Sequence, residues 1–378
     1  MDGVDGRKGL LGTTGVLLAI GLVMIYSASS GLARDRYGDA LFFIKRQMVW
    51  AAVAAVGAIL VTRIPYPRLL RWSPVILGAS LALLAAVLVC GSQIHGGRRW
   101  IRVGGIGFQP SEFAKIAMVL YLADIFSRKA SEVHTFRFFV RQAGVAGVAF
   151  LLILLEPDFG TAVLLGGICF LMFFTGGVRL RYLAGTMLLA LPALAGLVIL
   201  YPYRMVRILA FLSPWKYART IGYHVTQSII GLGSGGFWGV GLGDSGQKRG
   251  YLPEPHGDFI FSILGEEMGL LGALAVMALF LYWTVSGMRV AARARNQGGY
   301  FLAFGLTSLV AAQALFNIAV VTSCLPAKGI ALPLMSYGGS SLLFTLVAVG
   351  ILCNIASSAP EAVPDAVGDV QPLPGPVS

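Results

Sequence analysis

The chain alternates long apolar runs with short polar connections. A helix needs about 20 apolar residues to cross a bilayer, and about ten runs in this sequence reach or approach that length. We therefore predict an all-α, polytopic integral membrane protein with about ten transmembrane helices. The predicted spans are roughly 9–29, 45–62, 73–91, 109–126, 138–156, 159–177, 182–202, 258–287, 300–323 and 337–356.

Two polar segments depart from this pattern. Residues of about 203–257 connect the seventh and eighth spans, and we predict that they form one long extracellular loop. Residues 357–378 are rich in Pro, Val, Gly and Asp and have no hydrophobic periodicity. We predict that they form a disordered cytoplasmic tail and that residues 1–356 form the transmembrane domain.

Composition supports a membrane protein and excludes several other classes. Hydrophobic residues make up 57% of the 378 residues and charged residues 12%, whereas a soluble domain carries about 25% charged residues. The formal net charge is +12, but the basic residues fall in connections between apolar runs, so we expect no nucleic-acid binding. The four cysteines and four histidines are dispersed, and their spacing predicts no metal site.

The distribution of basic residues predicts an orientation. An even number of spans places both termini on one side, and the bias of Lys and Arg in the short connections favours cytoplasmic termini. The long loop is then extracellular, where its own basic residues bring no topological benefit. We interpret these residues as a surface for an anionic substrate. They are Arg204, Arg207, Lys216, Arg219, Lys248 and Arg249.

Ionisable side chains in or beside the spans are candidates for function, because they are costly in a bilayer. Glu112 and Lys115 are three residues apart and can pair on one helix face, in a structural or a functional role. Glu156 and Asp158 flank Pro157. This pattern predicts a tight turn between two spans, with the acids capping the next helix.

Asp258 lies where the long loop, with its glycine-rich segment Gly231–Gly243, leads into an apolar run. Asp is a preferred N-cap residue, so one interpretation is a helix cap. The other is a catalytic carboxylate at the boundary of water and lipid, and the cationic, glycine-rich context favours it. For Glu266 and Glu267, two turns further on, we expect pairing with a basic residue of another helix.

The segment 324–341 is also irregular between two spans. It contains two prolines, the lone basic residue Lys328, and a small polar cluster that includes Ser336 and Ser340. Irregular backbone at membrane depth persists only where it packs into protein or lines a water-filled cavity. We therefore expect this segment and the long loop to share one outward-facing cavity.

Several longer motifs follow one another along nearly the whole chain. They are YSAS at 26–29, GGRRWI at 96–101, QPSEFAK at 109–115, EPDFGTA at 156–162, TQS at 226–228, GVGLGDSGQKRGYLPEPHGDFIF at 239–261 and LPLMSYGGSS at 332–341. In content and order they resemble the SEDS family (shape, elongation, division and sporulation proteins). Gln247–Lys248 and PAKG at 326–329 resemble the cell-division branch (FtsW-like) more than the elongation branch (RodA-like). Gly257 stands where the family commonly has Thr, and Asp244 where it commonly has Asn.

This resemblance implies a ten-span glycosyltransferase of the bacterial plasma (inner) membrane, acting at the division site. Its substrate would be lipid II, which it would polymerise into β-1,4-linked glycan strands with release of undecaprenyl pyrophosphate. The partners implied are a class B penicillin-binding protein transpeptidase and other cell-division proteins. No ligand cluster in the sequence demands a cofactor, although a divalent cation (Mg²⁺ or Mn²⁺) could assist.

The resemblance also implies roles for individual residues. Asp258 would be the general base of an inverting reaction. Substrate-binding roles are expected for Arg98, Arg99, Arg204, Arg207, Lys248, Lys328, Ser336 and Ser340. Structural or cavity-shaping roles are expected for Glu112, Lys115, Glu156, Asp158, Gln227, Glu254 and His256.

Two alternatives come from other functional classes. A lipid II flippase would also use intramembrane charges and broken spans, but alternating access requires sites at the midplane rather than on the outer side. A scaffold that only recruits a transpeptidase has no need of a lone carboxylate in a cationic loop. Within the family, a RodA-type elongation polymerase is the neighbouring possibility.

Overall fold

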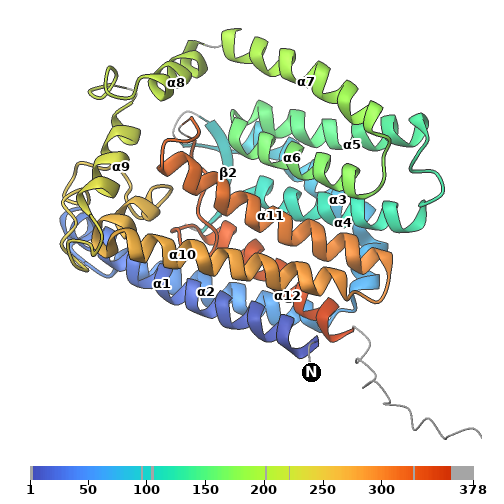
Figure 1. The fold of residues 1–378 in the computed structure, drawn as a ribbon, viewed down its shortest axis with the longest axis horizontal. Coiled ribbons are helices and arrows are strands. Elements are labelled where there is room, and N and C mark those ends of the chain that lie inside the picture. The colour runs from blue at the N-terminus through green and yellow to red at the C-terminus, as the bar shows by residue number, and fades with distance from the viewer. Residues whose placement is uncertain are drawn as a thin grey trace, which may run out of the picture.

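The computed structural model describes residues 3–94, 97–103, 106–200, 202–220, 222–326 and 328–358. Long helices run side by side along the longest axis of the molecule (Figure 1). Each predicted span coincides with a helix, although the bounds differ. These helices are α1 (Gly3–Tyr37), α2 (Phe42–Thr62), α3 (Tyr66–Cys90), α4 (Pro110–Arg128), α5 (Phe136–Leu155), α6 (Phe159–Thr175), α7 (Leu180–Leu200), α10 (Ile260–Ala292), α11 (Gln297–Val321) and α12 (Gly339–Ser357).

The helices confirm the all-α membrane fold class. In the described part of the chain, eight helices are long and apolar enough to cross a membrane, and α6 is a shorter apolar helix. The helix α4 is different, because it carries Glu112, Lys115 and Asp124 and almost all of its residues are buried. It packs against α3, α5, α6 and α11. The number of ten membrane crossings therefore stays a prediction.

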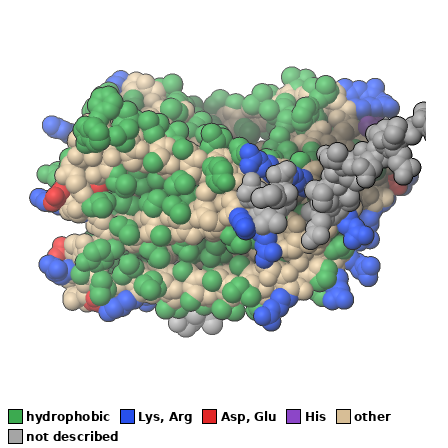
Figure 2. Space-filling model, turned by 60° about the horizontal axis from the view of Figure 1, so that its bottom comes forward, with side chains coloured by type: hydrophobic (Ala, Val, Ile, Leu, Met, Phe, Trp, Pro, Cys, Tyr) green, Lys and Arg blue, Asp and Glu red, His purple; other side chains and the backbone are tan. Residues whose placement is uncertain are grey.

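The surface is that of a protein surrounded by lipid. Large apolar side chains such as Val75, Leu188 and Leu189 are about three-quarters exposed, at 74%, 74% and 76%. On the face shown in Figure 2, apolar side chains spread over the left half, while Lys and Arg lie at the left edge and over the right part. Exposed apolar surface of this extent is unfavourable in water and favourable against acyl chains.

A small antiparallel sheet precedes α4, where the sequence predicted only a connection. Its strands are β1 (Ser92–Ile94), β2 (Gly97–Val103) and β3 (Ile106–Phe108), in the order β1-β2-β3. The register pairs Gln93 with Arg98 and Ile101 with Phe108. The sheet contacts α3, α4 and α12, and so it fixes the basic motif at 97–102 on the bundle.

The long connection is partly helical rather than one open loop. It contains α8 (Pro202–Leu212) and α9 (Tyr223–Ser234), followed by irregular chain up to Phe259. In Figure 1 these segments lie at the left end of the bundle, and the first and last described helices begin and end at the opposite end. The predicted tail, 357–378, lies outside the described residues from 359 onward, and α12 ends at Ser357.

The helix α10 is broken at Gly269, whose φ is 67° and ψ −169°. The segment 236–241 fills the break with its own backbone. Val240 and Gly241 donate their N–H groups to the carbonyls of Glu266 (3.0 Å) and Glu267 (3.1 Å), and the N–H of Leu270 donates to the carbonyl of Gly236 (2.9 Å). Backbone groups freed by a helix break must find partners at membrane depth, and here the glycine-rich segment supplies them.

Candidate active site

A cavity of ≈ 2810 Å³ opens at the end of the bundle that holds the long connection. Its walls come from α1, α2, β2, the start of α6, the chain from Leu242 to Phe259, and the segment 326–341. The prediction that the long loop and the segment 324–341 line one cavity is therefore confirmed. The basic side chains of the wall are Arg36, Lys45, Arg46, Arg99, Arg102, Arg207, Lys248, Arg249 and Lys328.

Asp258 lies in this wall, half-buried, two residues before α10 begins. The N-cap residue of α10 is Phe259, without a side-chain cap hydrogen bond. The capping interpretation of Asp258 is therefore wrong, and its carboxylate is available to the cavity. Burial, together with the negative charges of Glu254 and Asp158, raises the pKa of Asp258 to about 7, whereas the charge of Arg99 opposes the shift.

Asn317 of α11 fixes the backbone around Asp258. Its buried Nδ2 donates to the carbonyl of Asp258 (2.7 Å) and to that of Ile330 (2.6 Å). One amide group therefore joins the chain before α10 to the segment 328–331. The two irregular segments meet at Asp258, where the sequence suggested that they would share a cavity.

The neighbouring arginines Arg98 and Arg99 differ in position. Arg99 lines the cavity, and its side chain donates to the carbonyls of Glu156 (3.0 Å) and Pro157 (2.6 Å). Arg98 does not line the cavity, and its Nη1 lies 3.3 Å from the carbonyl of Val89 at the end of α3. The structure therefore does not support the predicted substrate-binding role of Arg98, whose guanidinium lies against the end of α3.

The other basic residues with predicted substrate-binding roles differ in their position relative to the cavity. Arg207 and Lys328 line the cavity, and Nζ of Lys328 lies 4.4 Å from the ring centroid of Phe159. The side chain of Arg204, in α8, lies outside the described residues. Arg249, which belongs to the predicted surface for an anionic substrate, also lines the cavity. Sequence reasoning assigned no site role to Arg36, Lys45, Arg46 or Arg102, which line it as well. One sequence signal could have identified these residues. Basic residues on the extracellular side do not help to orient the protein in the membrane, so they need another explanation.

Ser336 and Ser340 are buried outside the cavity lining, and their hydroxyls form hydrogen bonds with backbone groups. The hydroxyl of Ser336 accepts the N–H of Leu332 (2.8 Å). The hydroxyl of Ser340 accepts the N–H of Gln109 (3.1 Å) and donates to the carbonyl of Gly107 (3.2 Å). Their predicted substrate-binding roles are therefore replaced by a structural one, because both hydroxyls are used within the protein.

Glu112 and Asp158 each form internal contacts and also line the cavity. Nζ of Lys115 lies 2.8 Å from Glu112 and 2.7 Å from Oε1 of Gln313, and Glu112 reaches the cavity wall. Asp158 also lines the cavity and caps α6, because its carboxylate accepts the N–H (3.2 Å) and hydroxyl (2.8 Å) of Thr161. The predicted pairing and capping are both present.

Four further residues with predicted structural or cavity-shaping roles differ in burial and in their position relative to the cavity. They are Glu156, His256, Glu254 and Gln227. Glu156 is buried without a hydrogen-bond partner for its carboxylate among the described residues, and burial, with the charge of Asp158, raises its pKa to about 8. His256 packs on the ring of Phe43 at 4.3 Å, and burial lowers its pKa to about 4. Glu254 lines the cavity, while Gln227 is half-buried in α9 outside its lining.

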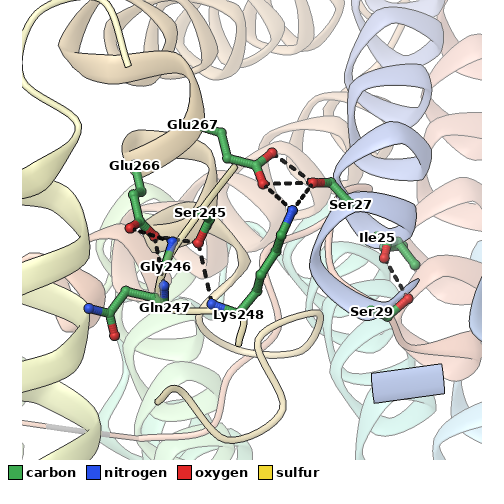
Figure 3. A network of polar contacts seen from close by, with 9 residues as sticks. All are labelled: Ile25, Ser27, Ser29, Ser245, Gly246, Gln247, Lys248, Glu266 and Glu267. Carbon is green, nitrogen blue, oxygen red and sulfur yellow. Dashed lines mark hydrogen bonds and ion pairs between the residues drawn. The ribbon is translucent and has the colours of Figure 1, made fainter. Parts of the chain in front are cut away.

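Lys248 lines the cavity, but its charge is already paired. Nζ lies 2.9 Å from Oε1 of Glu267 and 3.1 Å from the hydroxyl of Ser27, which donates to the same carboxylate (Figure 3). Lys248 therefore forms an internal ion pair between the loop and α10, to which Ser27 of α1 adds a hydroxyl, and the structure does not support direct substrate binding by Lys248. Glu267 has the basic partner that the sequence predicted, although it comes from the loop and not from another helix.

The described residues contain no group of three or more His, Cys, Asp or Glu side chains that could hold a metal ion. The donor set therefore does not fit a cation held by the protein alone. Assistance by Mg²⁺ or Mn²⁺ stays a prediction.

Comparison with known proteins assigns most of the chain to one family. The FtsW/RodA/SpoVE family model, described as cell cycle protein, matches residues 8–361. A probable peptidoglycan glycosyltransferase FtsW of Trichlorobacter lovleyi is 42% identical over 344 residues, covering 90% of each chain. Stage V sporulation protein E of Bacillus subtilis is 41% identical and covers 90% of this chain and 94% of its own.

Solved structures agree with this placement. One, described as "Structural coordination of polymerization and crosslinking by a peptidoglycan synthase complex", contains a chain with a TM-score of 0.77 and 27% identity, covering 92% of this chain and 97% of its own. The rod shape determining protein RodA of Thermus thermophilus has a TM-score of 0.70 and 28% identity, covering 94% and 97%. From its sequence match and its fold, this chain belongs to the FtsW/RodA/SpoVE family of polytopic membrane proteins.

Proposed function

We propose that this protein is a peptidoglycan glycosyltransferase that polymerises lipid II into β-1,4-linked glycan strands. One observation carries the proposal. A carboxylate with its pKa raised to about 7, Asp258, lies in the wall of a large cavity with many basic side chains. A base whose pKa is close to the working pH is suited to proton transfer. The relative from Trichlorobacter lovleyi bears the corresponding name.

The proposed reaction is a single displacement. Asp258 accepts the proton of the GlcNAc 4-hydroxyl of the acceptor while that oxygen attacks C1 of the donor MurNAc. The new C1–O bond forms as the bond from C1 to undecaprenyl pyrophosphate breaks, so the α-linked donor gives a β-1,4 product. Inversion requires one general base and no covalent intermediate, and Asp258 can supply that base.

The leaving group is a pyrophosphate, and it requires positive charge around it. We assign this role to basic side chains that line the same cavity as Asp258, namely Arg99, Arg102, Arg207 and Lys328. The charge of Lys248 is engaged by Glu267, so we assign Lys248 to loop structure. A divalent cation carried in by the substrate is compatible with this arrangement.

We further propose a cell-division role and a transpeptidase partner. The FtsW-named relatives at 42% identity favour the division branch over RodA. One similar structure is that of a peptidoglycan synthase complex in which polymerization and crosslinking are coordinated, and this favours a class B penicillin-binding protein as partner. The helices α1 and α12 begin and end at the end of the bundle opposite the long connection (Figure 1), and residues within 242–259 of that connection line the cavity. We therefore propose cytoplasmic termini and a cavity facing outward from the bacterial inner membrane.

The experiment that tests this function uses the purified chain with lipid II and a cognate class B partner. We expect glycan polymer that a muramidase degrades to disaccharide units. The flippase alternative predicts the opposite pair of results: no polymer, and translocation of fluorescent lipid II across proteoliposomes. The scaffold alternative predicts neither polymer nor translocation.

A further inference from the structure

Glu266, near the start of α10, holds the start of the chain that leads to Asp258 (Figure 3). Its carboxylate accepts the backbone N–H groups of Gly246 (3.0 Å) and Gln247 (3.3 Å), and the hydroxyl of Ser245 makes a short hydrogen bond to it. Ser234 of α9 is a fourth donor, at 3.3 Å. An ionised carboxylate bound by successive backbone N–H groups is a strong, oriented arrangement.

The surroundings make this contact hard to replace. Glu266 is 4% exposed and Ser245 is fully buried, so water cannot substitute for the missing partner if either group is lost. The adjacent Glu267 holds Lys248, the next residue of the same chain. The backbone of 236–241 is bound to the same turn of α10. The two acids and the backbone contacts together form what we call the α10 clamp, made of Glu266, Glu267, Ser245, Gly246, Gln247 and Lys248.

The clamp anchors the first residue of the segment 248–258. After Lys248 the chain turns back, with the N–H of Leu252 bonded to the carbonyl of Gln247 (2.9 Å), and Leu252 is buried in the core. The segment then forms the cavity wall from Pro253 to Asp258. The other end of the segment is held by Asn317 at the carbonyl of Asp258 and by Tyr337, whose N–H donates to the carbonyl of His256 (2.9 Å). The segment that carries Glu254 and Asp258 is therefore bound to other elements at both of its ends.

We infer that Glu266 is a positioning residue for the reaction, acting through the loop that it holds to place the carboxylate of Asp258 in the cavity. This inference rests on the proposed role of Asp258 as general base. Glu266 does not line the cavity and touches no reacting atom, so its effect on catalysis is indirect. Misplacement of a catalytic group by about 1 Å costs on the order of a hundredfold in rate.

A positioning role for Glu266 predicts a shift of the pH–rate profile, which a purely structural role would not cause. The charged groups near Asp258 are Glu254 on its own loop, Asp158 at the start of α6, Arg99 on β2, and Lys328 beside Gly329. Release of the clamp moves Glu254 and admits water, and both changes favour the charged form of Asp258. The acid limb of the pH–rate profile should then move to lower pH while the maximum rate falls.

The test compares Glu266→Gln and Ser245→Ala with the wild type, in complex with the class B partner. Gln keeps the size of Glu266 but has one acceptor oxygen and a donating NH₂ group, so the loop N–H groups lose an acceptor. Glu132→Gln is the matched control, because Glu132 is exposed and pairs only locally with Lys129. We measure kcat and KM for lipid II from about pH 5.5 to about pH 8.5, across the ionisation of a base with a pKa near the working pH, and hydrogen–deuterium exchange of the amides of residues 245–257.

We expect kcat to fall about tenfold to a hundredfold in Glu266→Gln, and less in Ser245→Ala, with KM within about threefold of the wild type. Exchange should increase in 245–257, and the acid limb should move to lower pH. Unchanged exchange, or a fall in rate with an unmoved pH profile, overturns the inference. If Glu266→Gln does not fold, Ser245→Ala gives the same readouts. A wild type that makes no polymer overturns the proposed function instead, while the exchange data still report on the clamp.

Discussion

Gly329 lies directly against the carboxylate of Asp258. A Cβ atom on Gly329 would stand 2.5 Å from Oδ2 of Asp258, closer than real contacts allow. The absence of a side chain at residue 329 is therefore what lets the carboxylate occupy its place between the two irregular segments. The pair explains why a glycine follows Lys328 in this wall of the cavity.

Substitution of Gly329 by Ala should displace the carboxylate of Asp258. We expect polymerisation to fall about tenfold to a hundredfold, since small displacements of a catalytic group are costly. Gly144→Ala in α5 is the matched control, because a Cβ there meets nothing within 4 Å. Equal rates for the two variants in the lipid II assay would show that the position of the carboxylate is not limiting.

The pH dependence of the rate should follow the ionisation of Asp258. A general base acts when it is deprotonated, and the pKa of Asp258 is raised to about 7. We expect kcat/KM to rise with pH through an acid limb near pH 7. Glu254→Gln removes a neighbouring negative charge and should move that limb to lower pH. An acid limb at the ordinary carboxyl value, about pH 4, in the wild type would contradict the assignment.

The raised pKa of Asp258 also affects folding stability. Its contribution to stability falls as pH rises, whereas the activity of the base increases. Asp258 holds its proton in the folded protein between its ordinary pKa of 3.8 and about 7, whereas the unfolded chain has lost it. Folding stability from this group therefore falls as pH rises through that window. Asp258→Asn removes the loss, so we expect a higher melting temperature than the wild type at about pH 8 and a smaller difference at about pH 4.

Removal of one partner of the buried Glu112–Lys115 pair should destabilise the protein strongly, whereas replacement of both partners should have a small effect on the free energy of unfolding. The two side chains are 10% and 3% exposed. Lys115→Met leaves Glu112 buried without its cation, and we expect a loss of about 3–5 kcal/mol in stability. The double variant with Glu112→Gln should recover most of it. Thermal unfolding in one detergent would measure both, and additive losses would contradict a coupled pair.

Arg98 and Arg102 provide a contrast between a side chain outside the cavity and one in its wall. Arg102 lines the cavity, whereas Arg98 contacts carbonyls at the end of α3. We expect Arg102→Gln to raise KM for lipid II about tenfold, the effect of losing one charge-assisted contact. Arg98→Gln should change KM by less than about twofold, because it makes no such contact with the substrate. A larger effect for Arg98 would reverse our placement of the two arginines.

The helices could be predicted from the sequence, but their ends could not. Apolar length locates a span because the bilayer sets the length of the helix that crosses it. It does not set where the helix stops, and α1 continues to Tyr37, past the predicted end at residue 29. The sheet at 92–108 was missed because strands of three to seven residues depend on pairing rather than on local periodicity.

The candidate site was predicted in outline. Asp258 and several cations stood out, because charges on the outer side of a membrane protein need an explanation. The sequence did not show that Ser336 and Ser340 are used by backbone partners, or that Glu267 pairs with Lys248. These outcomes depend on contacts between segments far apart in the chain, and hydropathy carries no information on them.

Polymerisation by Asp258→Asn tests the central claim most directly. The variant is measured with lipid II and the class B partner, above the pKa of about 7 that Asp258 has in the wild type, with melting temperature as the check on folding. Removal of a general base should lower the rate by about a hundredfold to ten-thousandfold in a protein that is folded and at least as stable. A folded Asp258→Asn variant that polymerises lipid II at the wild-type rate would contradict the account.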